Sequence, residues 1–224
     1  REATYTMLLH AGPEIAVAST KAYTGQVATL AFLAKAVGEA NGNEKAKKFD
    51  LVRELSIVAQ SIESTLSEKE LIEEKVRGLL ETTRNAFYIG RGQDYYVVME
   101  ASLKLKEISY IQCEGFAAGE LKHGTISLIE DGTPVIALIS DNPTVASHTR
   151  GNISEVVSRG ANALTIVEEG IEKEGDDIII NKVHPYLSSI SMVIPTQLIA
   201  YYTALGRGLD VDKPRNLAKS VTVE

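Results

Sequence analysis

The chain has 224 residues, of which 44% are hydrophobic and 24% charged, so its composition is that of an ordinary globular protein. Its formal net charge of −7 argues against nucleic-acid binding, because such proteins need a basic face to neutralise phosphates. The single cysteine, Cys113, excludes an intrachain disulfide and favours a reducing, cytoplasmic environment.

The first third of the chain is expected to be mostly helical. Residues 4–10 are rich in β-favouring side chains and predict a strand that a Gly-Pro turn ends. A helix is predicted next, with Ser19 or Thr20 as its N-cap and Gly42 after its end. From Glu44 to about Arg84 the apolar spacing predicts a charged helical hairpin. The start lacks a methionine and a signal-peptide pattern, and we expect it to lie inside a longer protein.

The rest of the chain alternates between strands and helices. Strands are predicted at 85–90, 133–140, 162–169 and 176–181, and helices at 94–112, 143–159 and 195–208. This alternation predicts an α/β fold with a parallel sheet covered on both faces, and such sheets bind ligands beyond the carboxyl ends of their strands. No run approaches the roughly 20 apolar residues that cross a bilayer, so no membrane partner is expected.

Three charged residues of the 94–112 helix share one face. Glu100, Lys104 and Glu107 stand at i, i+4 and i+7, within an arc of about 60°. Spacing alone is compatible with a solvated ion pair worth a few tenths of a kcal/mol. The functional alternative, which spacing favours less, is a carboxylate base whose protonation a neighbouring lysine controls.

Other candidate groups carry weaker signals. His123 lies in a Gly-bounded turn and suits proton transfer, although a structural histidine is as compatible with the pattern. The hydroxyls of Ser19 and Thr20 suit either an anion site or a plain helix cap. Lys219 suits a Schiff base or a solvated tail. Four histidines without metal-ligand spacing and a lone cysteine predict no metal site.

Three long segments resemble one family. AGPEIAVASTKAYTGQ, EASLKLKEISYIQCEGFAAGELKHG and DVDKPRNLAKSVTVE are similar, in order, to the isomerase half of the glucosamine-6-phosphate synthases, also called glutamine–fructose-6-phosphate aminotransferases (isomerizing). Members of this family place two SIS (sugar isomerase) domains behind a glutaminase domain. The likeness extends over the whole chain.

The resemblance implies a domain plan. It assigns 1–42 to the C-terminal part of a first SIS domain, 43–84 to a helical linker, 85–208 to a complete three-layer αβα second SIS domain, and 209–224 to an active-site tail. The glutaminase domain would lie outside this sequence. We therefore expect this chain not to hydrolyse glutamine and to be inactive alone.

The resemblance also implies residue roles in making glucosamine 6-phosphate from fructose 6-phosphate. Glu107 matches the base that moves a proton between C1 and C2, and Lys219 matches the lysine that forms a Schiff base. His123 matches the ring-opening histidine that reaches the neighbouring subunit of a homodimer. The remaining matches are the supporting groups Glu100 and Lys104 and the sugar-binding positions Val17, Ser19 and Ala218. No metal or organic cofactor is implied.

Two other interpretations stay open at this stage. One is a non-catalytic SIS module that senses sugar phosphates, which would need hydroxyls for the phosphate but no imine lysine. The other is an interaction or dimerisation fragment. Glu107 together with Lys219 favours the enzyme, and the absence of a basic patch disfavours a DNA-binding regulator.

Overall fold

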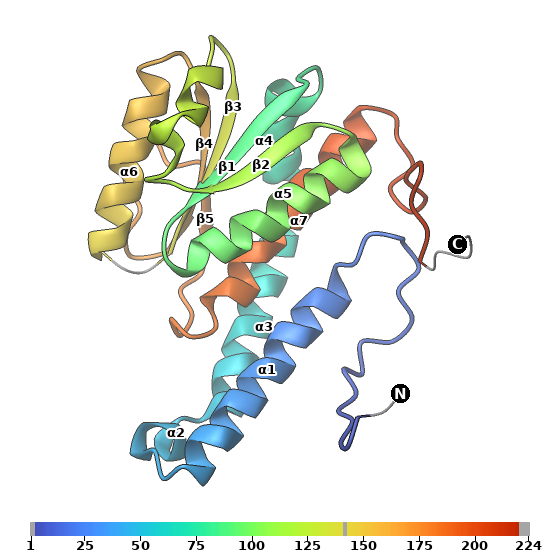
Figure 1. Ribbon diagram of the computed structural model, residues 1–224, viewed down its shortest axis with the longest axis vertical. Coiled ribbons are helices and arrows are strands. Elements are labelled where there is room, and N and C mark those ends of the chain that lie inside the picture. Colours follow the sequence, from blue (N-terminus) through green and yellow to red (C-terminus); the bar gives the residue numbers. More distant parts are fainter. Residues whose placement is uncertain (1–2, 141–142, 220–224) are drawn as a thin grey trace.

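The computed structural model of the protein describes residues 3–140 and 143–219. Its strands are β1 (Asn85–Gly90), β2 (Gln112–Ala117), β3 (Pro134–Ile139), β4 (Asn162–Glu168) and β5 (Ile178–Ile180). Its α-helices are α1 (Lys21–Ala40), α2 (Glu44–Lys48), α3 (Leu51–Ser67), α4 (Lys69–Leu80), α5 (Gln93–Ser109), α6 (Pro143–Val157) and α7 (Ser188–Gly206), with short 3-10 turns η1 (Leu121–His123) and η2 (Thr125–Leu128). The described strands pair in parallel in the order β2-β1-β3-β4-β5 (Figure 1).

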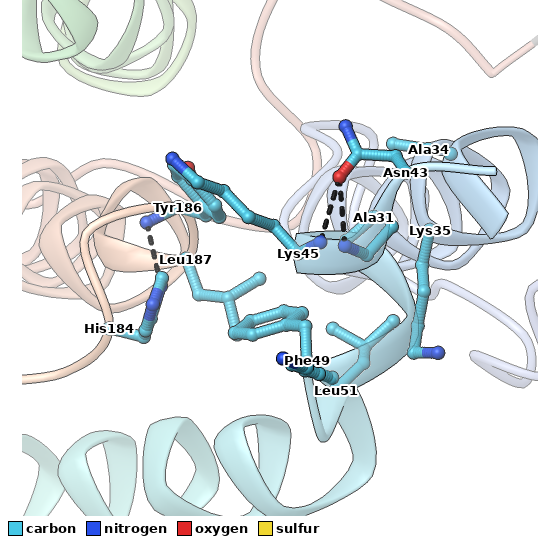
Figure 2. Close-up of a pocket in the computed structure, with 13 residues that line it drawn as sticks. Ala31, Ala34, Lys35, Asn43, Lys45, Phe49, Leu51, His184, Tyr186 and Leu187 are labelled. Atoms are coloured by element: carbon cyan, nitrogen blue, oxygen red, sulfur yellow. Dashed lines mark hydrogen bonds between the residues drawn. The ribbon is translucent and has the colours of Figure 1, made fainter. Parts of the chain in front are cut away.

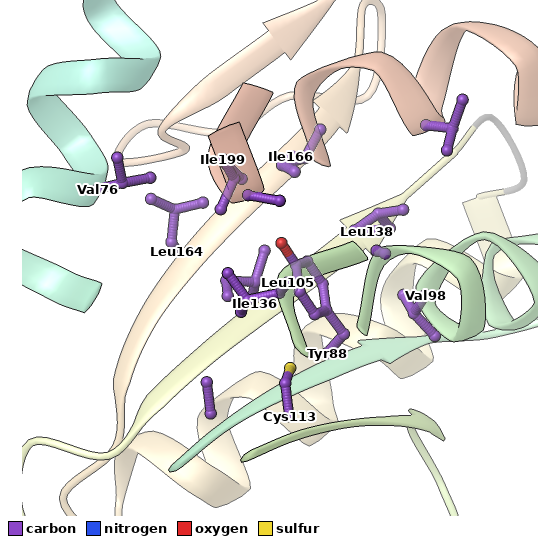
Figure 3. Close-up of a cluster of buried hydrophobic side chains, with 14 of the residues drawn as sticks. Val76, Tyr88, Val98, Leu105, Cys113, Ile136, Leu138, Leu164, Ile166 and Ile199 are labelled. Carbon is purple, nitrogen blue, oxygen red and sulfur yellow. The ribbon is translucent and has the colours of Figure 1, made fainter. Parts of the chain in front are cut away.

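The sheet has an apolar layer on each face. Tyr88, Ile136 and Ile166 point to one face and pack beneath α4, α5 and α7 (Figure 3). Their chain neighbours Phe87 and Val135 point to the other face, towards α6 and η1. Alternation along each strand therefore supplies both layers, since successive side chains of a strand point in opposite directions. The predicted three-layer α/β fold and its four predicted strands are confirmed.

The edge strand β2 was not predicted. The sequence favoured a helix through residue 112, but α5 ends at Ser109 because Tyr110 adopts a left-handed conformation, with φ 62°. Residues 112–117 then pair with β1 along its whole length. Their sequence, QCEGFA, has little apolar alternation, and only pairing with β1 makes it a strand.

The start of the last helix was also predicted wrongly. The sequence pattern favours Pro195 as its first residue, but α7 begins at Ser188 and continues through the buried Pro195. Proline is favoured in the first turn, which explains the error. Inside a helix it removes one backbone hydrogen bond, and here the packing of α7 against α5 and α4 compensates for that loss.

Two predictions for the first third are wrong. Residues 4–10 form no strand in the described chain; Tyr5 is 91% exposed and no neighbouring strand pairs with this segment. The hairpin expected over 44–84 is absent as well, because Glu68 alone separates α3 from α4 and a single residue does not reverse a chain. The helices α3 and α4 instead succeed one another along α7, and α1 lies beside α3 (Figure 1).

Among the described helices, none combines the length and the apolar character that crossing a membrane would require.

Candidate functional site

The charged face of α5 forms a largely buried cluster. The Lys104 ammonium lies 2.6 Å from Oε2 of Glu107 and 3.5 Å from Oε1 of Glu100. The Lys104 side chain is only 5% exposed, against 14% for Glu100 and 23% for Glu107. We call these three residues the α5 triad. Their burial rules out a freely solvated surface pair, the simpler of the two interpretations that spacing left open.

The triad lies on a helix that packs against α7 and against the strands β1 and β2. Two carboxylates flank one ammonium, as a buried lysine requires, because an unpaired buried charge is costly. Burial raises the pKa of the Glu100 carboxyl, although the Lys104 ammonium acts in the opposite direction. Burial and the charge of Glu100 also raise the pKa of Tyr23, a residue of α1 that packs against the same core. The first turn of α1 therefore lies beside the triad.

The C-terminal tail docks on the segment that precedes α1. Nζ of Lys219 lies 3.4 Å from Oε2 of Glu14. The same carboxylate accepts hydrogen bonds from the Ser19 hydroxyl at 3.0 Å and from the Thr20 backbone N–H at 2.6 Å. Burial acts to raise the pKa of Glu14, but these hydrogen bonds outweigh it and hold that pKa below its usual value.

Glu14 also explains how α1 begins. Thr20, one of the two predicted candidates, is the N-cap residue, but its side chain makes no capping hydrogen bond. The anion that a helix N-terminus attracts is here the Glu14 carboxylate of the chain itself. Val17 donates its backbone N–H to the Asp212 carbonyl at 3.0 Å, so the tail and this segment are joined at a second point.

A third anchor joins the tail to α5. The Arg215 backbone N–H donates to the Tyr110 hydroxyl at 2.8 Å, and the Arg215 guanidinium lies 4.1 Å from the centre of that ring. Tyr110 stands three residues after Glu107, directly beyond the end of α5. The structure thus joins the tail, the segment before α1 and the end of α5, which together carry Val17, Ser19, Ala218, Lys219 and the triad. Within the described residues no hydrogen bond or ion pair links Lys219 to Glu107 directly.

His123 lies elsewhere. It is exposed in η1, which follows β2 at the carboxyl edge of the sheet, where Gly90 pairs with Ala117. Glu107 lies in the last turn of α5, just before β2 starts at the opposite edge. Glu107 therefore lies near the sheet edge opposite to the carboxyl edge, at which a ligand of a parallel sheet is generally expected. The structure does not bring His123 together with Glu107.

Sequence reasoning missed four residues of this arrangement, namely Glu14, Tyr23, Tyr110 and Arg215. An acidic residue shortly before a helix start was a usable signal for Glu14. No local signal indicates Tyr110 or Arg215, because their contact joins positions 105 apart in the chain. The described residues contain no group of three His, Cys, Asp or Glu side chains that is arranged to hold a metal ion.

Comparison with known proteins gives the family. Residues 79–207 match the SIS domain family. The chain belongs to the SIS domain family. All 224 residues align with the glutamine–fructose-6-phosphate aminotransferase (isomerizing) of Streptococcus agalactiae serotype V at 84% identity, and with that of Streptococcus mutans serotype c at 81%. In both cases the chain spans 37% of the relative's length.

A solved structure supports the same assignment. The C-terminal domain of glucosamine-fructose-6-phosphate aminotransferase from Francisella tularensis superposes with a TM-score of 0.82 at 29% identity. The match covers 90% of this SIS chain and 58% of that chain. The resemblance noted in the sequence is confirmed.

Proposed function

We propose that this chain is the isomerase end of an enzyme that makes glucosamine 6-phosphate and glutamate from fructose 6-phosphate and glutamine. The observation that carries the proposal is the docked tail, which holds Lys219 against the segment beside the α5 triad. The 84% identity to an aminotransferase of this name, over every residue of the chain, supports it. Since the chain spans 37% of that relative, the complete activity belongs to a longer parent protein.

In this proposal Lys219 is the nucleophile. Its neutral amine adds to the C2 carbonyl of open-chain fructose 6-phosphate and releases water, forming an imine. The imine acts as an electron sink that makes the C1 protons more acidic. Glu14 positions the amine, and its weak ion pair with the exposed lysine leaves the side chain free to move towards the sugar.

Glu107 is the proposed base. Its carboxylate takes a proton from C1 and returns it to C2, which converts the ketose skeleton into the aldose skeleton. The bond of 2.6 Å to Lys104 fixes its position on a rigid helix, and Glu100 holds Lys104 from the other side. Before this proton transfer, ammonia from a glutaminase domain of the parent would add to the imine carbon C2 and expel Lys219 as its free amine, so that the amino nitrogen stays on C2.

His123 is proposed to open the sugar ring in the site of a second subunit. The support is its exposed position at the sheet edge opposite to Glu107. From there His123 is badly placed to act on a sugar bound at the triad of its own chain. Mixing a His123→Ala parent with a Glu107→Gln parent should restore part of the activity in mixed dimers. Failure of every such mixture to regain activity would overturn site sharing.

The proposed domain plan follows the same logic. Residues 1–42 would complete a first SIS domain, 43–84 would link the two domains, 85–208 would form the second and 209–224 the tail. A homodimer and a cytoplasmic location are part of this proposal.

Chemical trapping tests the proposed function. The full-length parent is incubated with fructose 6-phosphate and sodium borohydride, which reduces an imine to a stable secondary amine, and the modified lysine is located by peptide mass spectrometry. We expect the sugar on Lys219. Lys219→Arg keeps the charge opposite Glu14 but forms no imine, so this variant should fold, show no labelling at residue 219 and make no glucosamine 6-phosphate. Labelling of a different lysine, or turnover by Lys219→Arg, would overturn the proposal.

A further inference from the structure

A cavity separate from the α5 triad lies on the helical side of the molecule. It has a volume of about 610 Å3, which falls within the range typical of small-molecule sites. The second half of α1, α2, the start of α3 and the segment before α7 surround it (Figure 2). It shares no residue with the α5 triad or with the docked tail.

The charge of this cavity is opposite to that of the whole chain. Lys35, Lys45 and Lys48 line it, and none of its lining residues is an Asp or a Glu, although the chain carries a net charge of −7. Lys35 pairs with Glu39 outside the cavity at 2.5 Å. Within the described residues the ammonium groups of Lys45 and Lys48 have neither an ion pair nor a hydrogen bond. Two cations are therefore available to an anion.

Three aromatic side chains, those of Phe49, His184 and Tyr186, also line the cavity and pack against one another. The ring centres of Phe49 and His184 lie 4.7 Å apart, and those of His184 and Tyr186 lie 4.9 Å apart. His184 accepts the Tyr186 backbone N–H at Nδ1, at 3.2 Å, which orients its ring. Tyr186 is 74% exposed, and Lys45 extends towards it in Figure 2. The three rings are tilted against one another by 57° to 67°, so a flat ligand ring could contact the face or edge of Phe49 or Tyr186 singly, beside the ammonium groups.

The remaining lining selects against a hydroxyl-rich ligand. Ala31, Ala34, Ala46, Leu51 and Leu187 are apolar. Asn43 contributes an amide, but its oxygen already accepts the backbone N–H groups of Lys45 and Ala46 at the start of α2. A sugar would leave most of its hydroxyls without partners in this cavity, whereas an aromatic ring would not.

We infer that this cavity binds a small aromatic anion, meaning a flat ring that carries a phosphate or a carboxylate. Lys45 and Lys48 take the anionic group, while Phe49 and Tyr186 contact the ring. The inference does not depend on the proposed aminotransferase activity, because the residues involved are different.

The test is titration calorimetry of the full-length parent with 1-naphthyl phosphate. We expect saturable binding with a dissociation constant below about 1 mM. Inorganic phosphate, which lacks the ring, and 1-naphthol, which lacks the charge, should each bind at least about tenfold more weakly. Fructose 6-phosphate should still bind at its own site in the presence of saturating naphthyl phosphate.

Variants separate this cavity from non-specific attraction. The double variant Lys45→Ala with Lys48→Ala and the single variant Tyr186→Ala should each weaken naphthyl phosphate binding at least about tenfold. Lys47→Ala is the matched control, since Lys47 lies on the same helix but pairs with Glu44 and does not line the cavity. The inference is overturned if the parent shows no saturable binding, if Lys47→Ala weakens binding as much as the double variant, or if fructose 6-phosphate displaces the probe.

Discussion

The ammonium nitrogen of Lys219 lies 3.4 Å from Oε2 of Glu14, although the two residues are 205 positions apart. Glu14 simultaneously accepts the Thr20 N–H and the Ser19 hydroxyl at the start of α1. One carboxylate therefore begins a helix and holds the tail that carries the proposed nucleophile. Because an exposed ion pair contributes only about 0–1 kcal/mol, the contact positions the lysine without immobilising it.

Replacing Glu14 should loosen the tail more than it destabilises the fold. In Glu14→Ala we expect about 1 kcal/mol of lost stability from the helix start. Hydrogen exchange at residues 212–217 should become faster, and Glu14→Gln should have a smaller effect because it still accepts the Thr20 N–H. Glu39→Gln, on the exposed side of α1, is the control. Unchanged tail exchange in Glu14→Ala would contradict the positioning role.

Replacing Glu107 should remove proton transfer but leave imine formation intact. In the full-length parent, Glu107→Gln should lower product formation by about 10²- to 10⁴-fold, the range of a general base. Incorporation of deuterium from heavy water at C1 and C2 should fall in parallel, while borohydride still traps the sugar on Lys219. Glu114→Gln, on the edge strand β2, should change neither property. Undiminished deuterium incorporation in Glu107→Gln would remove this residue as the base.

Replacing Lys104 should destabilise the protein because Glu100 and Glu107 would lose the ammonium that pairs with them. Lys104→Met leaves Glu100 and Glu107 as neighbouring carboxylates without their ammonium, and we expect a loss of about 3 kcal/mol in the free energy of unfolding. This figure is at the low end for buried pairs, because the Glu107 side chain keeps 23% exposure.

The loss in Lys104→Met should depend on pH. It should be smaller at low pH, where the carboxyls are protonated, and a second change, Glu107→Gln, should restore part of it. Chemical denaturation measures these effects, with Lys106→Met as the control on the same helix. Equal losses at low and neutral pH would show that lost packing, and not charge, is responsible.

Asp94 should make stability fall as pH rises. This carboxyl is 1% exposed, its Oδ1 has no hydrogen-bond partner in the described chain, and burial raises its pKa from 3.8 to about 6. Between these values the folded protein keeps a proton that the unfolded chain releases. The free energy of unfolding should therefore drop by about 3 kcal/mol from pH 3.8 to about 6 because of this group.

Asp94→Asn should flatten this part of the stability profile. The asparagine oxygen can still accept the Ser140 N–H, so the variant mainly removes the titration. Glu174→Gln, an exposed change, should leave the profile of the wild type intact. An identical slope in Asp94→Asn and the wild type would contradict the assignment.

Tyr110 should anchor the tail through its hydroxyl and its ring together. Tyr110→Phe loses the hydrogen bond to Arg215, which is worth about 1 kcal/mol, but keeps the ring under the guanidinium. Tyr110→Gly loses both contacts yet suits the left-handed backbone, so tail protection should fall further while global stability changes little. Equal tail protection in all three proteins would show that Tyr110 is not an anchor.

The sequence predicted the central strands well, because strands that are buried on both faces consist of consecutive apolar residues. Runs such as PVIALI are apolar at every position, as a strand covered on both faces must be. The edge strand β2 and the start of α7 were missed, because QCEGFA becomes a strand only through β1 and Pro195 is tolerated only by packing. The strand predicted at 4–10 does not form, although its residues favour strands, because no neighbouring strand pairs with this segment in the described chain.

The sequence by itself determined the α/β class, the common face of Glu100, Lys104 and Glu107, and the family resemblance, because these depend on periodicity and on residue identity in order. Only the tertiary structure decided that the triad is buried, that Glu14 and Tyr110 hold the tail, and that His123 lies at the opposite edge of the sheet from Glu107. The docking of the tail depends on contacts between positions 105 and 205 residues apart. The burial of the triad depends on the elements packed around α5, and the position of His123 depends on the pairing of β2 with β1. No local pattern encodes such contacts.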